Sequence, residues 1–261
     1  MTTPGALEHA PGAALITSAL SATPQGGRRV AVLQSNYLPW KGYFDIIADV
    51  DLFVFYDDVQ YTRSDWRNRN IIKTPAGRKW LTVPVRASFG QPICEVAIND
   101  SNWARKHWKT LQQNYSRAPY FDLYADFLGE VYLGRRWARL ADLNRHLIVA
   151  ITERFLGIRT EFADSRAFDL SGKGLDRLLE LLKRVGATTY VSGPAARDYI
   201  DPTRFEGEGI ELTYKSYSGY PEYDQLYPPF EHSVSILDLL FHTGREAAHY
   251  VWAWRRARNR G

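Results

Sequence analysis

Two observations predict an α/β protein with a parallel sheet core, flanking helices and a helical C-terminal half. Short apolar runs that suit buried strands alternate with segments whose apolar residues recur at helical spacing. The first two apolar runs, RRVAVLQ and DLFVFY, are joined by one helical segment, and this βαβ arrangement is typical of parallel strands.

The N-terminal half holds most of the expected strands. After RRVAVLQ and the loop SNYLPW, the segment KGYFDIIADV places its large apolar side chains on one helical face. The strand DLFVFY follows and stops at Asp57. Beyond a polar, arginine-rich stretch, WLTVPVRA and ICEVAIN are predicted as strands, and Pro84 marks the first as an edge strand.

The second half is mainly helical. Helical spacing occurs in SNWARKHWKTLQQNY, RRWARLADLNRHLIVAITERFLGI and GLDRLLELLKRVGA, and Gly157 and Gly186 suit the ends of the last two. The strands TTYVSG and ELTYKSY flank PAARDYI, where Pro194 suits the first turn of a helix. SVSILDLLFHTG and REAAHYVWAWRRARNR are expected to complete the fold as helices.

Composition divides the chain into a tail and one domain. Residues 1–28 are rich in Ala, Pro, Gly, Ser and Thr and lack a periodic apolar pattern, so we expect a disordered tail. Residues 29–261 are predicted to form a single α/β domain. Hydrophobic residues make up 45% of the 261-residue chain and charged residues 24%, which excludes a wholly disordered protein.

Charge, apolar runs and cysteine usage narrow the class further. The net charge is +4, and arginines near the C-terminus account for it, so the near-neutral body gives no case for nucleic acid. No apolar run is long enough for a membrane span. The one cysteine, Cys94, excludes a disulfide framework and a cysteine-based zinc site, and we expect a cytoplasmic protein.

Polar residues follow the ends of three expected parallel strands. Ligands of open parallel sheets bind beyond the carboxyl ends of the strands, so residues that follow those ends should converge. The sequence therefore predicts one crevice for a small-molecule substrate. The residues expected to line or wall it are Gln34, Asn36, Tyr37, Trp40, Asp58, Gln60, Tyr61, Arg67, Arg69, Ser192 and Gly193.

The charged members of this set allow two interpretations each. Asp57 and Asp58 point to opposite faces, so at most one serves a site, as general base, metal ligand or hydrogen-bond acceptor; otherwise both stabilise a turn and pair with arginines. Arg67 and Arg69 share a face if extended and could hold a phosphate beside Ser192, or could form a solvated edge.

His107 is the histidine best suited to general-base catalysis. It lies at the border of the buried face of its helix, where a partly buried imidazole can titrate near neutral pH; the alternative is a core histidine bonded to a backbone carbonyl. Histidines, cysteine and carboxylates show no zinc spacing, so no metal site is predicted. Cys94 lies in an expected strand and is interpreted as a buried structural thiol.

Several of these stretches together resemble a known family. The long run LQSNYLPWKGYFDIIADVDLFVFYDDVQYTRSDWRNRNIIKT with WLTVPV, and later TTYVSGPAARDYI and FEHSVSILDLLFHTG, closely resemble the WbqC-like proteins over about residues 29–246. Such proteins occur with bacterial O-antigen and other specialised or natural-product biosynthesis genes. The resemblance implies a transferase that acylates or aminoacylates an amino group, for example on an amino sugar.

We therefore expect a transferase that moves an acyl or aminoacyl group from an activated thioester to an amine. His107 or Asp58 would be the base. The oxyanion donors would be Gln34, Asn36, Gln60 and the backbone near Gly193. The donor would be linked to phosphopantetheine or coenzyme A, with an acyl carrier protein as partner and no further cofactor. Two alternatives stay open: a nucleotide- or nucleotide-sugar-using α/β enzyme, and a non-catalytic binding protein of a biosynthetic complex.

Overall fold

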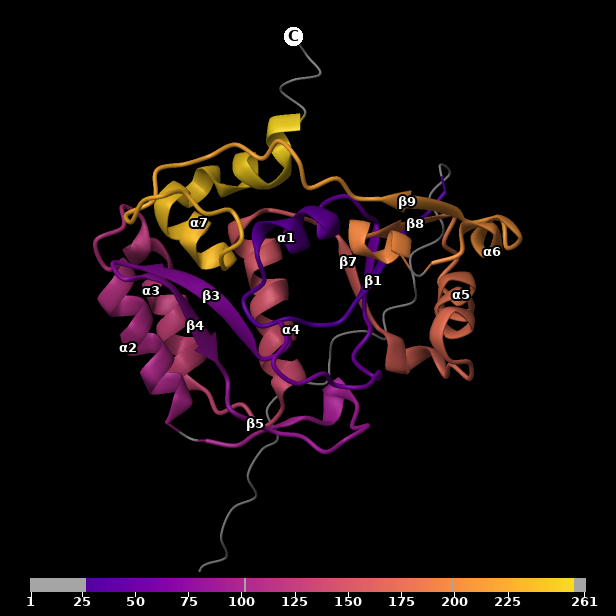
Figure 1. Cartoon of the computed structure of the whole chain (residues 1–261), viewed down its shortest axis with the longest axis horizontal. Helices are drawn as coiled ribbons and strands as arrows, with labels where there is room; N and C mark the ends of the chain where they lie inside the picture. Colours follow the sequence, from indigo (N-terminus) through magenta and orange to yellow (C-terminus); the bar gives the residue numbers. More distant parts are fainter. Residues whose placement is uncertain (1–26, 101, 199, 256–261) are drawn as a thin grey trace, which may run out of the picture.

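Five parallel strands form the central sheet in the computed structural model of the protein, which describes residues 27–100, 102–198 and 200–255. The strands are β1 (Arg29–Leu33), β2 (Leu52–Phe55), β7 (Glu161–Asp164), β8 (Thr189–Ser192) and β9 (Glu211–Tyr214). Their order is β7-β2-β1-β8-β9 (Figure 1). β2 and then β7 are added on one side of β1, and β8 and then β9 are added on the other side. The direction in which strands are added therefore reverses between β1 and β8. This sheet confirms the predicted α/β class and the parallel βαβ unit.

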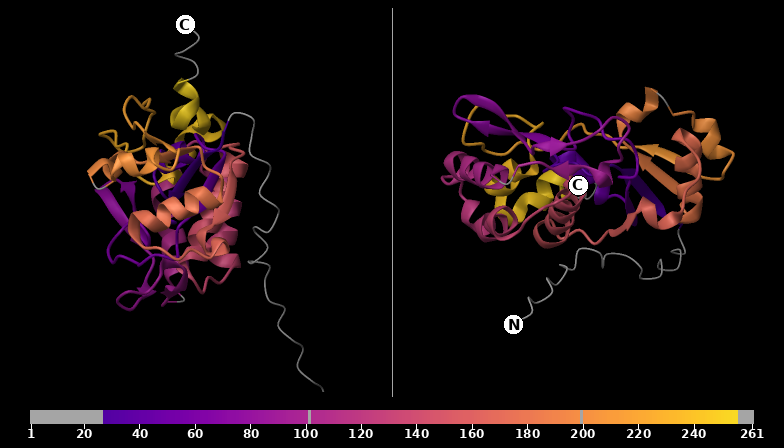
Figure 2. Two further views of the ribbon diagram at one scale, coloured as in Figure 1. Left: turned by 90° about the vertical axis from the view of Figure 1, so that its right-hand side faces the viewer. Right: turned by 90° about the horizontal axis from the view of Figure 1, so that it is seen from below.

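Helices cover both faces of the sheet. The α-helices are α1 (Lys41–Ile47), α2 (Trp103–Tyr115), α3 (Phe121–Gly129), α4 (Leu140–Ala150), α5 (Gly174–Arg184), α6 (Pro202–Glu206) and α7 (Ile236–Thr243). In Figure 1, α5 and α6 lie on one side of the strands and α1, α4 and α7 on the other, and Figure 2 shows the same arrangement from two further directions. Among the described residues, no helix is both long and apolar enough to cross a membrane.

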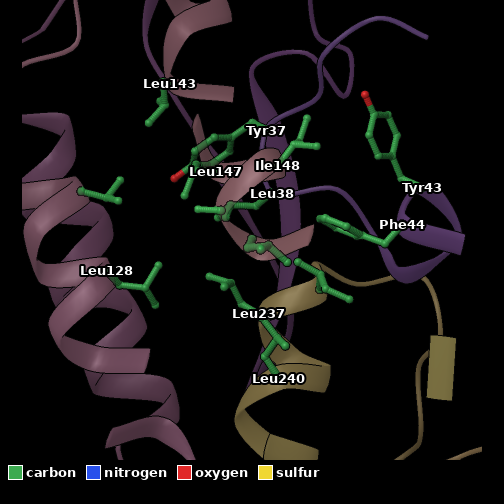
Figure 3. Close-up of a cluster of buried hydrophobic side chains, with 14 of the residues drawn as sticks. Tyr37, Leu38, Tyr43, Phe44, Leu128, Leu143, Leu147, Ile148, Leu237 and Leu240 are labelled. Carbon is green, nitrogen blue, oxygen red and sulfur yellow. The ribbon is translucent and has the colours of Figure 1, made fainter. Parts of the chain in front are cut away.

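Alternate strand residues feed two separate hydrophobic cores. Ala31 and Phe53 point into the larger core, which α1, α2, α3, α4 and α7 complete. Val30, Val32 and Leu52 point into the smaller core under α5 and α6. The larger core also takes in the loop that follows β1, whose Tyr37 and Leu38 pack among leucines of α3, α4 and α7 (Figure 3). The three central strands, β1, β2 and β8, are thus buried on both faces, as their continuous apolar sequences require, whereas the edge strands β7 and β9 are partly exposed.

Two short antiparallel pairs lie outside the central sheet. One is the hairpin of β3 (Arg69–Thr74) and β4 (Gly77–Thr82), and the other joins β5 (Val85–Arg86) to β6 (Ala97–Ile98). Pro84 separates β4 from β5, since proline has no N–H to donate to a ladder. The prediction of a strand over ICEVAIN is wrong for its first half, where Pro92 leads into a 3₁₀ turn at Ile93–Glu95.

Several expected helices are shorter or of another type. The long pattern before Gly157 becomes a helix only from Leu140, and it ends in a π-helical turn. The first five residues of PAARDYI, Pro194–Asp198, form a 3₁₀ helix rather than an α-helix. The 3₁₀ helices are Ile93–Glu95, Ser165–Phe168, Pro194–Asp198 and Gly244–Glu246, and the π-helical turns are Glu130–Gly134, Ile151–Phe155 and His249–Ala253. Gly157 and Gly186 have φ angles of 63° and 67°, the left-handed conformation expected after a helix.

Arg28 belongs to the folded domain, although the tail was expected to extend through it. Its side chain is 4% exposed and donates to Glu161 Oε2 at 2.6 Å and to the Val185 carbonyl at 3.3 Å. Its N–H donates to Thr188 Oγ1 at 2.8 Å. The ordered domain thus includes Arg28, whereas residues 1–26 of the expected tail lie outside the described residues.

We predict that deletion of residues 1–26 leaves the melting temperature within about 2 °C of the full chain, because their composition offers little apolar surface to bury.

Arg28→Ala should lower the free energy of unfolding by about 2 kcal/mol through its lost charged hydrogen bonds. Arg29→Ala, whose ion pair with Asp49 is more than a third exposed, is the matched control and should have little effect. Thermal and urea denaturation check both; a large loss on deletion would contradict the first expectation.

Candidate functional site

One candidate site among the described residues is a cavity at the point where the strand order reverses. This switch-point cavity has a volume of about 520 Å³ and lies at the carboxyl ends of β1 and β8. It is lined by Val32, Leu33, Gln34, Tyr56, Gly174, Leu175, Leu178, Tyr190, Ser192, Gly193, Pro194, Ala195, Ala196, Ile200 and Tyr217. Both its position and its volume are those of small-molecule sites in open α/β sheets.

The polar groups of this cavity come from the strand ends, as the sequence predicted. Gln34 follows β1, Ser192 is the last residue of β8 and Gly193 follows it, so the parallel pairing brings them together. Arg67 donates a hydrogen bond to Gln34 Oε1 and is itself held by Asp65 at 2.7 Å. Because arginine can only donate, this contact fixes the amide orientation and leaves the Nε2 hydrogens of Gln34 as the donors that its side chain can offer a ligand.

Asn36 and Trp40 line a separate cavity. This tryptophan pocket, of about 200 Å³, is lined by Asn36, Pro39, Trp40, Trp66, Asn70 and Ser233. Asn36 Oδ1 is buried there without a hydrogen-bond partner among the described residues. The Trp40 ring meets the Tyr217 ring edge-on, with centroids 4.9 Å apart, and Tyr217 lines the switch-point cavity. The two cavities are therefore neighbours across this ring pair.

The loop between β1 and α1 is held in a strained conformation at this boundary. Leu38 has a φ of 45°, a left-handed conformation that costs an apolar residue about 1–2 kcal/mol. The Asn70 amide stabilises it by donating to the Leu38 carbonyl at 2.8 Å. A Cβ atom at Gly42 would lie 2.2 Å from the Trp40 ring, so only glycine lets that ring rest against α1. The position of the tryptophan pocket thus depends on local backbone chemistry.

The two adjacent aspartates form ion pairs outside both cavities. Asp57 is fully buried and accepts from the Ser35 N–H at 2.8 Å and from Arg145 Nε at 2.7 Å. Burial raises the pKa of Asp57, and the neighbouring Arg145 opposes that rise. Asp58 accepts from Arg177 of α5 and from the Ser165 hydroxyl. Neither aspartate lines the switch-point cavity. Of the two interpretations drawn from the sequence, the structure agrees with the one in which both aspartates pair with arginines.

His107 lies in the larger core, away from both cavities. Its Nδ1 is 2.8 Å from the Tyr37 hydroxyl, and its Nε2 is 3.1 Å from the Thr82 carbonyl. The Tyr37 hydroxyl is also bonded to Tyr132. Burial lowers the pKa of His107 to about 4. The structure therefore differs from the expectation that His107 opens into the pocket, and fully buried Tyr37 is no pocket wall.

The remaining predicted residues lie elsewhere. Gln60 is exposed and forms an isolated bridge with Pro92. Arg69 lies over the Trp80 ring at 4.2 Å. Tyr61 lines a third, shallower cavity of about 440 Å³ with Arg63 and Arg86. Within the described residues, no group of three or more His, Cys, Asp or Glu side chains could hold a metal ion.

Sequence reasoning missed much of the apolar lining of the switch-point cavity. Tyr56 is the last residue of the run DLFVFY, and strand alternation could have placed it on the side of the smaller core. Leu175 and Leu178 are three positions apart on α5, a spacing that the sequence shows as one apolar helical face. The sequence does not show that both are only half-buried and line a cavity. Tyr217 follows β9 and carried no pattern that pointed to the site.

Comparison with known sequences settles the family. The profile of the WbqC-like protein family matches residues 34–250. The chain belongs to the WbqC-like family. The resemblance noted from the sequence motifs is thereby confirmed. This WbqC-like chain is also 48% identical over 226 residues to the uncharacterized protein Rv1507c of Mycobacterium tuberculosis (strain ATCC 25618 / H37Rv), covering 86% of the chain and 97% of that relative. No solved structure matches the WbqC-like chain.

The burial of His107 predicts an acid-sensitive fold. Its pKa in the folded WbqC-like protein is about 4, below the usual 6.5, so below pH 6.5 the unfolded chain binds a proton that the folded chain excludes. Stability should therefore fall by about 3 kcal/mol as the pH drops from 7 to 4. Urea denaturation across this pH range gives the free energy of unfolding at each pH. This free energy should fall less steeply toward acid for His107→Gln than for the wild type, whereas exposed His249→Gln should follow the wild type. Equal slopes for all three proteins would contradict a neutral, buried His107.

Proposed function

We propose that this protein transfers an acyl or aminoacyl group from a thioester to an amine in the switch-point cavity. The observation that carries the proposal is the pairing of neutral hydrogen-bonding groups at the strand ends with an apolar chamber beside them. Gln34, Ser192 and the backbone at Gly193 lie where the reacting carbonyl would lie, and the apolar residues would hold the rest of the donor. Preorganised donors of this kind stabilise the oxyanion that develops in acyl transfer.

The proposed reaction is a direct attack. The amine nitrogen forms a C–N bond to the thioester carbonyl carbon, negative charge develops on the carbonyl oxygen, and the C–S bond breaks. The sulfur leaves as a thiolate and takes up the proton that the nitrogen loses. The residues that line the cavity include no cysteine, histidine or carboxylate, so the proposal assigns none of these groups as nucleophile or base. The ionisation of the amine itself then sets the pH dependence of the rate.

The proposed donor carries phosphopantetheine, as coenzyme A or on an acyl carrier protein. Gly174 in the cavity lining is the first residue of α5. A helix N-terminus favours a phosphate group. The tryptophan pocket beside Tyr217 would take the amine substrate, because Asn36 Oδ1 accepts N–H hydrogen bonds and tryptophan faces attract cations.

A nucleotide- or nucleotide-sugar-using enzyme is the second candidate, and one observation favours it. The strand order reverses at β1, as in doubly wound folds that bind nucleotides at the switch point. The loop after β1, QSNYLPW, lacks the glycines that let a backbone approach a pyrophosphate. For that reason we rank acyl transfer first.

The proposal is tested by incubating the full chain with a panel of acyl and aminoacyl thioesters and primary amines and detecting amides by mass spectrometry. We expect Gln34→Ala to lower kcat/KM by about 100-fold, the loss typical of one oxyanion donor. Gln113→Ala, on the exposed side of α2, is the matched control and should retain full activity. Amide formation at an undiminished rate by Gln34→Ala would remove this cavity from the mechanism. Product only in the presence of ATP would favour the second candidate.

Cys94→Ala should keep at least half of the wild-type rate. Cys94 lies in the turn after Pro92, outside the cavity lining, and burial raises the pKa of its thiol, which disfavours the reactive thiolate. The measurement is the steady-state rate with the best substrate pair from the panel. Complete loss of activity in a variant with an unchanged melting temperature would require a covalent acyl-enzyme instead of direct attack.

A further inference from the structure

Five aliphatic residues and one tyrosine line one part of the switch-point cavity, which we call the apolar wall. They are Val32, Leu175, Leu178, Tyr190, Ala196 and Ile200. Four of them are members of the smaller hydrophobic core, and the two leucines pack against it. The cavity is therefore an unfilled continuation of that core, open at the polar strand ends, and not only a depression of the surface.

The space exists because small and half-buried residues meet there. On α5, Leu181 and Leu182 are fully buried, whereas Leu175 and Leu178 are only half-buried and border the cavity. Opposite them, the 3₁₀ helix after Pro194 presents Ala196. Protein interiors are otherwise close-packed, and unfilled apolar volume lowers stability. A ligand that supplies the missing apolar contacts would recover that loss.

The chemistry of the apolar wall selects the kind of ligand. Its one polar side chain, Tyr190, stacks its ring on Phe205, with planes 4° apart. The adjacent hydroxyl of Tyr56 is hydrogen-bonded to Arg177. An ammonium group or a nucleobase edge placed against this wall would lose its hydrogen bonds to water without replacement, which is unfavourable. A hydrocarbon chain loses none.

We propose that the apolar wall binds an aliphatic acyl chain, so that the donor is an alkanoyl thioester and not an aminoacyl thioester. This inference rests on the proposed function for the reaction. The thioester carbonyl lies at Gln34 and Ser192, and the chain extends from there along α5 toward Ile200. Each methylene that packs against the apolar wall is removed from contact with water. The affinity for the thioester therefore rises with the length of the acyl chain until the cavity is filled.

The test measures binding by isothermal titration calorimetry of the full chain with N-acetylcysteamine thioesters and no separate amine substrate. From acetyl to hexanoyl, we expect the dissociation constant to fall about fourfold for each added methylene. Glycyl and alanyl thioesters should bind at least tenfold more weakly than acyl thioesters of equal size. Absence of any dependence on chain length, or tighter binding of the aminoacyl thioesters, would overturn the inference.

Two variants locate the chain. Ala196→Leu fills the space beside α5 and should weaken hexanoyl binding at least tenfold while leaving acetyl binding within twofold. Leu178→Ala enlarges the cavity and should move the best chain length upward by one or two carbons, which tests the same wall if Ala196→Leu does not fold. Ala76→Leu, at the exposed tip of the β3–β4 hairpin, is the matched control and should bind every thioester like the wild type. Unchanged chain-length preference in both wall variants would place the chain elsewhere.

The outcomes separate this inference from the proposed function. Chain-length-dependent binding without amide formation from any amine would refute the transfer reaction but keep the acyl-binding wall. Amide formation from aminoacyl donors alone would support the transfer reaction and refute the aliphatic donor.

Discussion

One buried carboxylate fixes the carboxyl edge of the sheet on which the candidate site is built. Asp57, just beyond β2, accepts the backbone N–H of Ser35, just beyond β1, and pairs with Arg145 of α4. Arg145 continues the contact to Asp164 at the end of β7. A lone carboxylate would be very costly at this depth, so the three strand ends and α4 must hold these partners together. The path of the chain through Ser35 then determines where Gln34 and Asn36 lie.

Two cores of unequal size explain why the larger cavity lies on only one face. The face under α1, α4 and α7 is filled by aromatic and leucine side chains and includes the loop after β1. The opposite face is covered by α5 and the short α6, and its packing leaves space beside the half-buried Leu175 and Leu178. The switch-point cavity occupies this unfilled space. Strand order brings Gln34 and Ser192 to it, and α5 supplies its apolar side.

Periodicity predicted the parts of the molecule that depend on local sequence. The βαβ unit, the parallel sheet and the convergence of Gln34, Ser192 and Gly193 follow from apolar runs and from the shared polarity of parallel strands. Partners between distant segments could not be read in the same way. His107 is neutralised by burial beside Tyr37, and Asp58 is engaged by Arg177 of α5. These pairings depend on how helices dock, which no local pattern encodes.

The contact between Trp40 and Tyr217 has an optical consequence. The indole of Trp40 lines the smaller pocket, rests on Gly42 and meets a ring that lines the larger cavity. Its surroundings therefore change when a molecule enters either compartment. The excited state of an indole responds to the polarity and motion of its neighbours, so this side chain is an intrinsic reporter. The contribution of Trp40 to the emission of this eight-tryptophan chain can register the arrival of two different molecules.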